Sequence, residues 1–415
     1  MEIVNGVDLH LIKTNQFKTN HLTFRFSGKR QKETLAQRVL VAQMLTAANE
    51  VYPTSRTLKE KLASLYGAEL STRLSTKGKV HILDINLSFI SSHYSFHQES
   101  LLEEMFSLLK TILFEPLISV QQFQTKLFDL EKEHLIQYLE ADKEDRFYYS
   151  DLELQQLYYL DDDVKYTKHA NSDLVKNENS YTAYQEFQRM LKEDKIDIFL
   201  TGEYDDYLVL QLVESLGLQS RQLDLDYVYR QPFSSVLREK IEQKTSGQSV
   251  LQQAYHFPFR FGDNDYYAFL VFNGLLGAYP HSLLFDSIRE KMGLAYSIGS
   301  HFDSHTGLLK VYAGIDKRDR KKVLQLINHQ VKGIRFGRFH ISALEETKKM
   351  LINNARLAED NPYNLMELAY NKSIFGDQCL GLEEWIDRIR QITKEDVMAV
   401  AGQVRLQSIY FLEGE

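Results

Sequence analysis

The sequence predicts an α+β fold made of two homologous α/β-sandwich domains in tandem, each an antiparallel-rich sheet packed with helices. Three observations support this prediction. The chain has 415 residues, which is more than a single hydrophobic core usually organises. Short stretches that alternate apolar and polar residues are interspersed with longer stretches of helical periodicity. One arrangement of helices, turn and hairpin also occurs twice.

The repeated arrangement begins with a long helix followed by a Tyr-Pro turn. In the first half, the turn at 52–55 (YPTS) leads to a helix containing Lys-Glu-Lys, a glycine and a hairpin. In the second half, the turn at 279–282 (YPHS) leads to a helix containing Arg-Glu-Lys, a glycine and a hairpin. Self-similarity of this kind is most simply explained by a duplicated structural unit.

The boundary between the two copies is predicted from a change in pattern. Residues 217–246 carry little periodicity and are punctuated by glycine and proline, as is typical of connecting segments. We therefore predict an N-terminal domain at 1–220, a linker at 221–246 and a C-terminal domain at 247–415. A long surface loop within one domain is the alternative for the linker.

The elements of the first half follow from the spacing of apolar residues. Leu22, Phe24 and Phe26 alternate as in a strand that buries one face. Proline at 116 cannot continue the helix that precedes it. The predicted elements are strands at 2–13, 21–27 and 196–201, a hairpin at 69–89, and helices at 33–51, 56–66, 99–114, 120–159 (bent near 142–145), 181–192 and 205–216.

The elements of the second half follow from the same rules. The last strand repeats the alternation seen at the start of the chain. The predicted elements are strands at 249–257, 294–299, 309–315 and 407–413, and helices at 265–276, 284–292, 317–334, 341–359, 363–375, 381–391 and 394–402.

The composition limits the class of protein. A net charge of −8 argues against binding to nucleic acid or to an anionic membrane surface. The single cysteine, Cys379, allows no disulfide within the chain and suits a reducing compartment. No signal-peptide pattern and no run of 18 apolar residues is present in the sequence. We expect a cytoplasmic protein with no nucleic-acid or membrane partner.

Residues 284–315 contain two side chains of chemical interest. Leu284, Ile288 and Met292 share one face of a predicted helix, which ends at Gly293. Arg289 lies late in this helix, and Tyr296 lies on the strand that follows, where Leu294 and Ile298 are expected to share its face. A guanidinium and a phenol can both donate hydrogen bonds to one carbonyl or oxyanion. Alternatively, Arg289 is a solvated helix charge and Tyr296 a half-buried strand aromatic.

The segment 289–296 (REKMGLAY) resembles the C-terminal-domain signature of the pitrilysin/insulinase metallopeptidase family. That family includes insulysin-like enzymes, the mitochondrial processing peptidase and bacterial two-subunit peptidases. Its members carry an arginine and a tyrosine, seven positions apart, that contact the substrate backbone beside a zinc site in another domain. The resemblance therefore implies substrate-binding roles for Arg289 and Tyr296. The two-domain layout extends it over essentially the whole chain.

Active members of that family carry H-x-x-E-H on the first long helix, with two zinc-binding histidines and a glutamate as general base. In this sequence the likeness places Val39, Ala42 and Gln43 at those positions, and no histidine occurs between His21 and His81. Valine and alanine cannot bind zinc. The chain is thus expected to have a degenerate zinc site and no metal of its own. Glu131, near the position of the third ligand, is then read as a surface or ion-paired charge.

Other residues with metal-binding chemistry carry weaker signals. His93 and His97, with Glu99 nearby, are expected on the solvated surface. His301 and His305 flank Asp303 in a predicted turn, which leaves a metal site there as an alternative. No phosphate-binding loop, G-x-S-x-G or G-x-G-x-x-G motif occurs, so nucleotide binding and serine hydrolysis find no support.

These observations predict a non-catalytic Arg/Tyr subunit of a two-component zinc metallopeptidase, inactive alone. Its expected partner is a homologous H-x-x-E-H subunit that carries the zinc, and its expected ligand is a peptide held in a shared chamber. A homodimer is the alternative assembly for the isolated chain. Two other functions stay open: a peptide-binding or scaffold protein without proteolysis, and an independent enzyme that uses a metal at His301 and His305.

Overall fold

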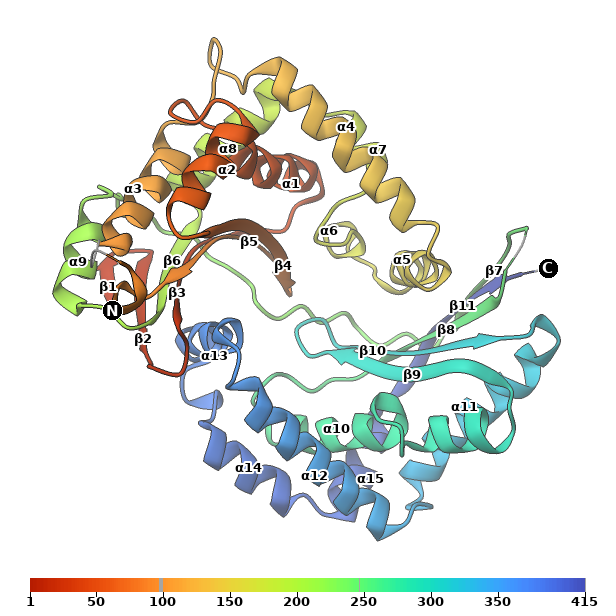
Figure 1. Cartoon of the computed structure of the whole chain (residues 1–415). Coiled ribbons are helices and arrows are strands. Elements are labelled where there is room, and N and C mark those ends of the chain that lie inside the picture. The colour runs from red at the N-terminus through yellow and green to blue at the C-terminus, as the bar shows by residue number, and fades with distance from the viewer. Residues whose placement is uncertain (97–99, 246, 415) are drawn as a thin grey trace. The chain divides into compact units, whose positions relative to one another are not determined.

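The computed structural model describes residues 1–96, 100–245 and 247–414 (Figure 1). The chain divides into two compact units. Unit 1 comprises residues 1–141, 166–227 and 360–369, and unit 2 comprises residues 142–165, 228–359 and 370–415. Each unit contains one β-sheet. Among the described residues, no helix combines the length and the apolar character that crossing a lipid bilayer requires.

Unit 1 is built on a six-stranded sheet with the order β1-β2-β6-β3-β5-β4. Strands β2 and β6 are parallel, and the other neighbours are antiparallel. One face is apolar because residues such as Phe24 and Phe26 of β3 point into a buried core. The strands are β1 (Glu2–Val4), β2 (Val7–Lys13), β3 (Thr19–Lys29), β4 (Glu69–Lys77), β5 (Val80–Ile90) and β6 (Lys195–Gly202).

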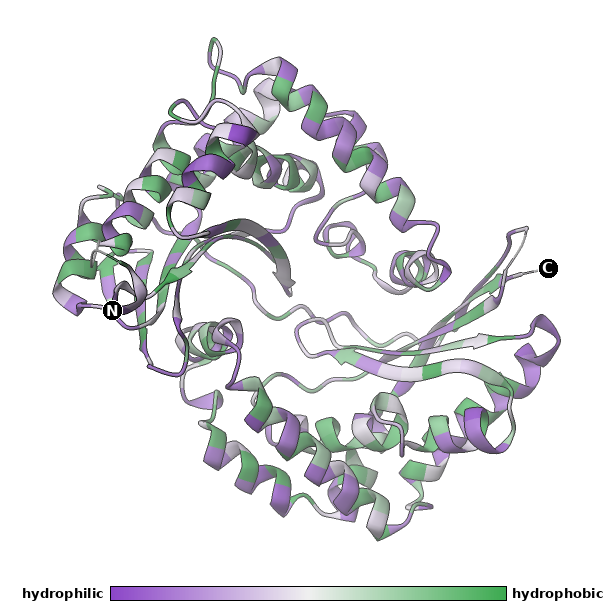
Figure 2. Ribbon diagram, viewed as in Figure 1, coloured by the Kyte–Doolittle hydropathy of each residue, from purple (hydrophilic) through white to green (hydrophobic). Residues whose placement is uncertain are grey.

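Helices cover the apolar face of this sheet (Figure 1). Helix α1 is apolar along most of its length, and its buried residues lie on several sides, whereas α4 alternates between hydrophobic and hydrophilic residues (Figure 2). The helices of unit 1 are α1 (Lys32–Ala47), α2 (Ser55–Ser64), α3 (Leu101–Phe114), α4 (Thr125–Asp142), α7 (Ser172–Lys176), α8 (Ser180–Glu193) and α9 (Asp206–Glu214), with a short 3₁₀ turn at Ser92–Tyr94.

Unit 2 is built on a five-stranded sheet with the order β7-β11-β8-β10-β9. The strands are β7 (Arg238–Gln243), β8 (Ser249–His256), β9 (Ala295–Asp303), β10 (Leu308–Ile315) and β11 (Arg405–Glu413). The helical elements are α5 (Arg146–Tyr158), α6 (Asp162–Lys165), α10 (Asn264–Asn273), η2 (Gly274–Ala278), η3 (Phe285–Lys291), η4 (Lys317–Asp319), α11 (Arg320–Arg335), α12 (Ile341–Ala358), α13 (Pro362–Phe375, whose first turns belong to unit 1), η5 (Gly376–Gln378), α14 (Leu382–Gln391) and α15 (Lys394–Gln403).

The two sheets correspond strand by strand. Strands β2-β6-β3-β5-β4 of unit 1 match β7-β11-β8-β10-β9 of unit 2 in order and direction, including one parallel pair in each sheet. The predicted α+β fold class is therefore confirmed, and the correspondence agrees with a duplicated unit.

The predicted linker at 221–246 needs correction at its C-terminal end. Residues 238–243 form strand β7, so the second sheet begins before residue 247. This strand was not predicted because it is polar, and Ile241, its one apolar residue, is exposed. The alternation that identifies half-buried strands is absent from such a segment.

The two halves of the sequence also exchange one segment each. Residues 142–165, from the first half, belong to unit 2, and residues 360–369, from the second half, belong to unit 1. In unit 2, α5 packs against β8 and β11 on the sheet face that the other helices leave uncovered (Figure 1). A single cut of the sequence near residue 220 cannot describe this arrangement.

Limited proteolysis should first cut the connection between α9 and β7. Within it, Arg221, Tyr229 and Gln231 are buried, whereas residues 232–237 are largely exposed and form no helix or strand. Chymotrypsin should therefore cleave first at Phe233 or Leu237. N-terminal sequencing of the first fragments would check this, and initial cleavage between residues 100 and 216 would contradict it.

Candidate substrate-binding site

The positions expected for a zinc motif lie in the core of unit 1. Val39 and Ala42, on α1, are 0% and 1% exposed and pack in the main hydrophobic cluster. Gln43 is half-buried on the same helix. The neighbouring Arg38 is fully buried, donates a hydrogen bond from Nε to Nδ1 of His81 (3.0 Å) and forms an ion pair with Asp194 (2.7 Å). This helix is thus structural at each position that would carry zinc chemistry.

Glu131 lies on α4 and is close to a single histidine partner. Its carboxylate is 3.7 Å from Nδ1 of His134, one turn further along the helix. This contact agrees with the predicted role of Glu131 as a surface or ion-paired charge.

Arg289 and Tyr296 lie on adjoining elements of unit 2. Arg289 is in η3, a π-helical segment that ends at Lys291. Gly293 follows with φ of +60°, a left-handed conformation that favours glycine, and β9 starts at Ala295. Segments with π-helical hydrogen bonding are frequent at functional sites.

Tyr296 occupies a β-bulge at the start of β9. In the pairing with β10, Gly314 lies opposite Ser297 and Ile315 lies opposite Ala295, so Tyr296 has no opposite residue. A bulge bends the strand and redirects side chains. Ala295 and Ile298 are consequently buried, whereas the Tyr296 side chain is 81% exposed. The expectation that Tyr296 shares a face with Ile298 is wrong for this reason.

Both side chains have free hydrogen-bonding capacity. The Arg289 guanidinium lies over the ring of Phe285, 4.5 Å from its centre, and its Nε is 3.8 Å from the Glu290 carboxylate. The Tyr296 hydroxyl forms no hydrogen bond within the part of the chain that the structure describes. The two residues therefore present hydrogen-bond donors to solvent from neighbouring elements.

The alternative metal site at His301 and His305 is not assembled. Asp303 instead closes the turn, accepting hydrogen bonds from the His305 backbone N (2.8 Å) and the Thr306 hydroxyl (2.8 Å). The His305 ring stacks on Phe261 and Phe375, whereas His301 lines a separate cavity of about 400 Å³. Desolvation and the charge of Lys310 lower the pKa of His301 to about 4.

Neither His93 nor Cys379 belongs to a cluster of potential metal ligands among the described residues. His93 lies 3.8 Å from Glu203 at the surface, while His97 and Glu99 lie outside the described residues. Cys379 is buried.

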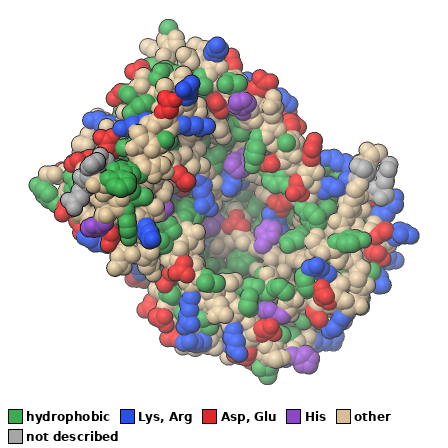
Figure 3. All heavy atoms as spheres, in the orientation of Figure 1, with side chains coloured by type: hydrophobic (Ala, Val, Ile, Leu, Met, Phe, Trp, Pro, Cys, Tyr) green, Lys and Arg blue, Asp and Glu red, His purple; other side chains and the backbone are tan. Residues whose placement is uncertain are grey.

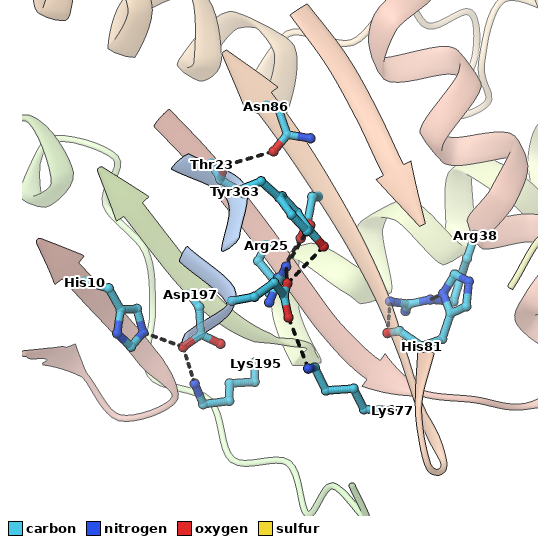
Figure 4. Close-up of polar contacts among 12 residues, drawn as sticks. His10, Thr23, Arg25, Arg38, Lys77, His81, Asn86, Lys195, Asp197 and Tyr363 are labelled. Atoms are coloured by element: carbon cyan, nitrogen blue, oxygen red, sulfur yellow. Dashed lines mark hydrogen bonds and ion pairs between the residues drawn. The ribbon is translucent and has the colours of Figure 1, made fainter. Parts of the chain in front are cut away.

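A charged network on the second face of the unit 1 sheet was not predicted from the sequence (Figure 4). Arg25, fully buried on β3, donates from Nε and Nη2 to the Asp84 carboxylate on β5 (2.6 and 2.8 Å). It also bonds Glu367 of the exchanged segment, which further pairs with Lys77 (3.1 Å) and accepts from the Tyr363 hydroxyl (3.1 Å). In the sequence, Arg25 lies between Phe24 and Phe26. This order could have indicated that the second face of the strand is polar.

The carboxylate of Glu367 is strongly stabilised in its charged form. Burial alone would raise its pKa, but the charges of Arg25 and Lys77 and the hydrogen bonds that they donate outweigh burial and lower the pKa to about 2. The network therefore holds the segment 360–369 on the sheet of unit 1 through an ionised carboxylate.

One cluster on the same face has metal-ligand chemistry. Asp8, His10 and Asp197 bring their ligand atoms within 4.8 Å of one another. The Lys195 ammonium, however, lies 2.6 Å from Asp197 and 2.9 Å from Asp8. It supplies the positive charge that a metal ion would bring, and His10 completes the cluster by bonding Asp197 (2.8 Å) (Figure 4).

Comparisons with known proteins agree with the fold. The family model described as "Peptidase M16 inactive domain" matches residues 184–351. A Bacillus subtilis protein named "Probable inactive metalloprotease YmfF" is 28% identical over 412 residues, covering 99% of this chain and 96% of that protein.

Solved structures give the same result. A conserved protein from Enterococcus faecalis V583 is 36% identical, with a TM-score of 0.96 over 100% of this chain and 98% of the other. A peptidase M16 inactive domain from Pseudomonas fluorescens shares the fold, with a TM-score of 0.78 at 15% identity over 99% of this chain and 96% of the other. The chain belongs to the pitrilysin-type peptidase M16 family, as a member without the H-x-x-E-H motif.

The purified chain should contain no stoichiometric zinc and should not cleave unfolded peptides by itself. The reason is that α1 offers Val39, Ala42 and Gln43, and no histidine, at the expected zinc positions and that Lys195 neutralises the Asp8–Asp197 cluster. Metal analysis and a peptidase assay would check this. One tightly bound zinc per chain with chelator-sensitive activity would contradict it.

Replacing Glu367 with glutamine should destabilise unit 1 by roughly 2 kcal/mol at neutral pH, because it removes a charge-assisted partner of Arg25 and Lys77. Since the folded-state pKa is depressed, this contribution is present above about pH 4.5. It is lost as the pH falls toward 2. Urea unfolding of Glu367→Gln and wild type should therefore give a difference that narrows below pH 4.5.

The matched control is Glu214→Gln, which removes an exposed carboxylate on α9 of the same unit. It should leave stability within about 0.5 kcal/mol of wild type at each pH. An equal effect of the two substitutions at pH 7, or a Glu367→Gln effect independent of pH, would show that Glu367 does not act through its charge.

Proposed function

We propose that this chain is the non-catalytic, Arg/Tyr-bearing subunit of a two-component zinc metallopeptidase. A homologous partner with H-x-x-E-H would supply zinc, the general base and the attacking water. This chain would supply Arg289 and Tyr296 as donors to the substrate backbone. The observation that carries the proposal is Tyr296, exposed on a β-bulge with an unpaired hydroxyl, in a chain whose zinc positions are filled by buried Val39 and Ala42.

The proposed chemistry divides one mechanism between two chains. Zinc bound to the partner lowers the pKa of its water and so provides a nucleophile near neutral pH. In this chain, the Tyr296 hydroxyl and the Arg289 guanidinium would donate to the substrate carbonyl. Their hydrogen bonds would strengthen as negative charge develops on that oxygen, by roughly 3 kcal/mol for a well-placed donor.

The position of β9 supports binding of an extended peptide. Strand β9 is the last in the sheet order β7-β11-β8-β10-β9, so its outer edge pairs with no other strand among the described residues. An extended peptide can add to an open strand edge through main-chain hydrogen bonds. Tyr296 lies at the start of this strand, so a peptide aligned along β9 would pass close to its hydroxyl.

Tyr296→Phe and Arg289→Ala should lower turnover by the reconstituted complex roughly a hundredfold, the size expected for loss of an oxyanion donor. Each removes a donor that acts mainly in the transition state, so kcat should fall more than KM rises. Both residues are exposed, so the free energy of unfolding should change by less than about 1 kcal/mol. The measurements are peptide cleavage, complex formation and thermal unfolding with the zinc-bearing homologue.

Two substitutions serve as matched controls. Tyr207→Phe removes an exposed hydroxyl on α9, and Arg335→Ala removes an exposed guanidinium near an aromatic ring on α11. Reconstituted complexes that contain either control variant should cleave the peptide at the wild-type rate. Unchanged cleavage by Tyr296→Phe and Arg289→Ala would refute the proposed role and favour a scaffold without proteolysis. A large fall in Tm would assign the pair a structural role.

A further inference from the structure

Tyr296 lines a cavity of about 680 Å³ within unit 2. The walls come from the segment that enters β8, from the bulge of β9 and from the chain that leaves β10. The residues that line it are Gly247, Gln248, Ser249, Tyr296, Ile315, Asp316, Lys317 and Arg318. The cavity therefore adjoins the residue to which the proposed function assigns substrate binding.

Three donors around this cavity form no hydrogen bond within the described part of the chain. The amide Nε2 of Gln248 is buried from solvent and has no hydrogen-bond partner among the described residues. The Tyr296 hydroxyl and the Lys317 ammonium also form no hydrogen bond in the part of the chain that the structure describes. A buried donor without an acceptor is unfavourable, so an occupant with acceptor oxygens would complete the arrangement.

The local charge is positive although the chain as a whole carries −8. Residues 316–322 (DKRDRKK) hold five basic and two acidic side chains, and Figure 3 shows lysine and arginine side chains at the end of unit 2 where α11 begins. The Asp316 carboxylate is already hydrogen-bonded to a neighbouring residue. It accepts hydrogen bonds from Arg318 N (2.9 Å), Nε (3.2 Å) and Nη2 (3.0 Å). The charge of Asp316 also acts on Lys317, so one carboxylate serves two cations, Lys317 and Arg318, and one positive charge is in excess on this wall.

We propose that this cavity is a binding subsite for a carboxylate of the peptide substrate. The carboxylate belongs either to an aspartate or glutamate close to the bond held at Tyr296, or to the C-terminus of the peptide. The one positive charge in excess among Asp316, Lys317 and Arg318 matches one negative charge, and the donors of Gln248 and Tyr296 match the lone pairs of carboxylate oxygens. The inference rests on the proposed function for the identity of its ligand as a peptide.

The test uses fluorescent decapeptides with one glutamate moved through each position, their glutamine counterparts, and versions with a free or amidated C-terminus. Binding to the isolated full chain is measured by anisotropy, and cleavage by the reconstituted complex. Glutamate at one position, or the free C-terminus, should bind about two- to fivefold more tightly than its neutral counterpart, as for a solvent-exposed charge pair. Tighter binding of a peptide with glutamate at one position would assign the subsite to a side-chain carboxylate. Tighter binding of the peptide with a free C-terminus would assign it to the terminal carboxylate.

Lys317→Gln should remove this preference, and Lys322→Gln is the matched control. Lys322 is an exposed cation of the same basic run that does not line the cavity, so its loss should leave the preference intact. Equal binding of charged and neutral peptides by wild type would overturn the proposal. So would equal effects of the two lysine substitutions, which would indicate general attraction to the basic run.

The binding measurement distinguishes a failure of this inference from a failure of the proposed function. If Tyr296→Phe leaves cleavage unchanged while Lys317 still determines the charge preference, the subsite stands and the peptidase role falls. If Tyr296→Phe abolishes cleavage while wild type shows no charge preference, the peptidase role stands and the subsite is overturned.

Discussion

The fully buried Arg25 guanidinium imposes the constraint on which unit 1 depends. A buried charge is tolerated only when it is paired and hydrogen-bonded. Arg25 finds one carboxylate, Asp84, on the neighbouring strand, but its second partner, Glu367, lies 342 residues further along the chain. Arg25 therefore gains its second carboxylate only when a segment from the second half of the sequence is in place. Unit 2 has the reciprocal requirement, because α5 supplies Leu154 and Tyr158 to the second face of its sheet.

This exchange also supports the strand that bears the candidate site. In unit 2, the Tyr158 hydroxyl donates to Gly307 O (3.0 Å) and the Tyr159 hydroxyl donates to Thr306 (2.8 Å). Both contacts hold the turn that joins β9 to β10. Lys310 on β10 pairs with Asp151 of α5 (2.5 Å). Residues from the first half of the sequence thus fix the hairpin that carries Tyr296, and a donor acts best when the elements behind it are rigid.

Local patterns predicted much of the fold, because they follow directly from which face of an element is buried. Leu22, Phe24 and Phe26 are buried as their alternation indicates. The predicted helical face of Leu284 and Ile288 is buried too, but Met292 is 48% exposed because η3 ends at Lys291.

Features that depend on contacts between distant parts of the chain were not predicted from the sequence. The bulge at Tyr296 depends on how β9 pairs with β10, and the Arg25–Glu367 contact joins distant segments, so neither leaves a periodic signal. For the candidate site, the identity of Arg289 and Tyr296 came from resemblance to a family. Their exposure and the adjoining cavity came from the structure.

The contrast between α1 and β9 bears on what the chain has retained. On α1, apolar side chains at the zinc positions contribute to the core, where burial stabilises the fold. At β9, Tyr296 contributes little to stability, and a single exposed aromatic residue would by itself need no explanation. The Tyr296 hydroxyl, however, shares one cavity with a Gln248 amide and a Lys317 ammonium that, like it, form no hydrogen bond among the described residues. Three donors around one cavity lack acceptors within the described chain, so an outside group with acceptor oxygens is the natural counterpart of this surface.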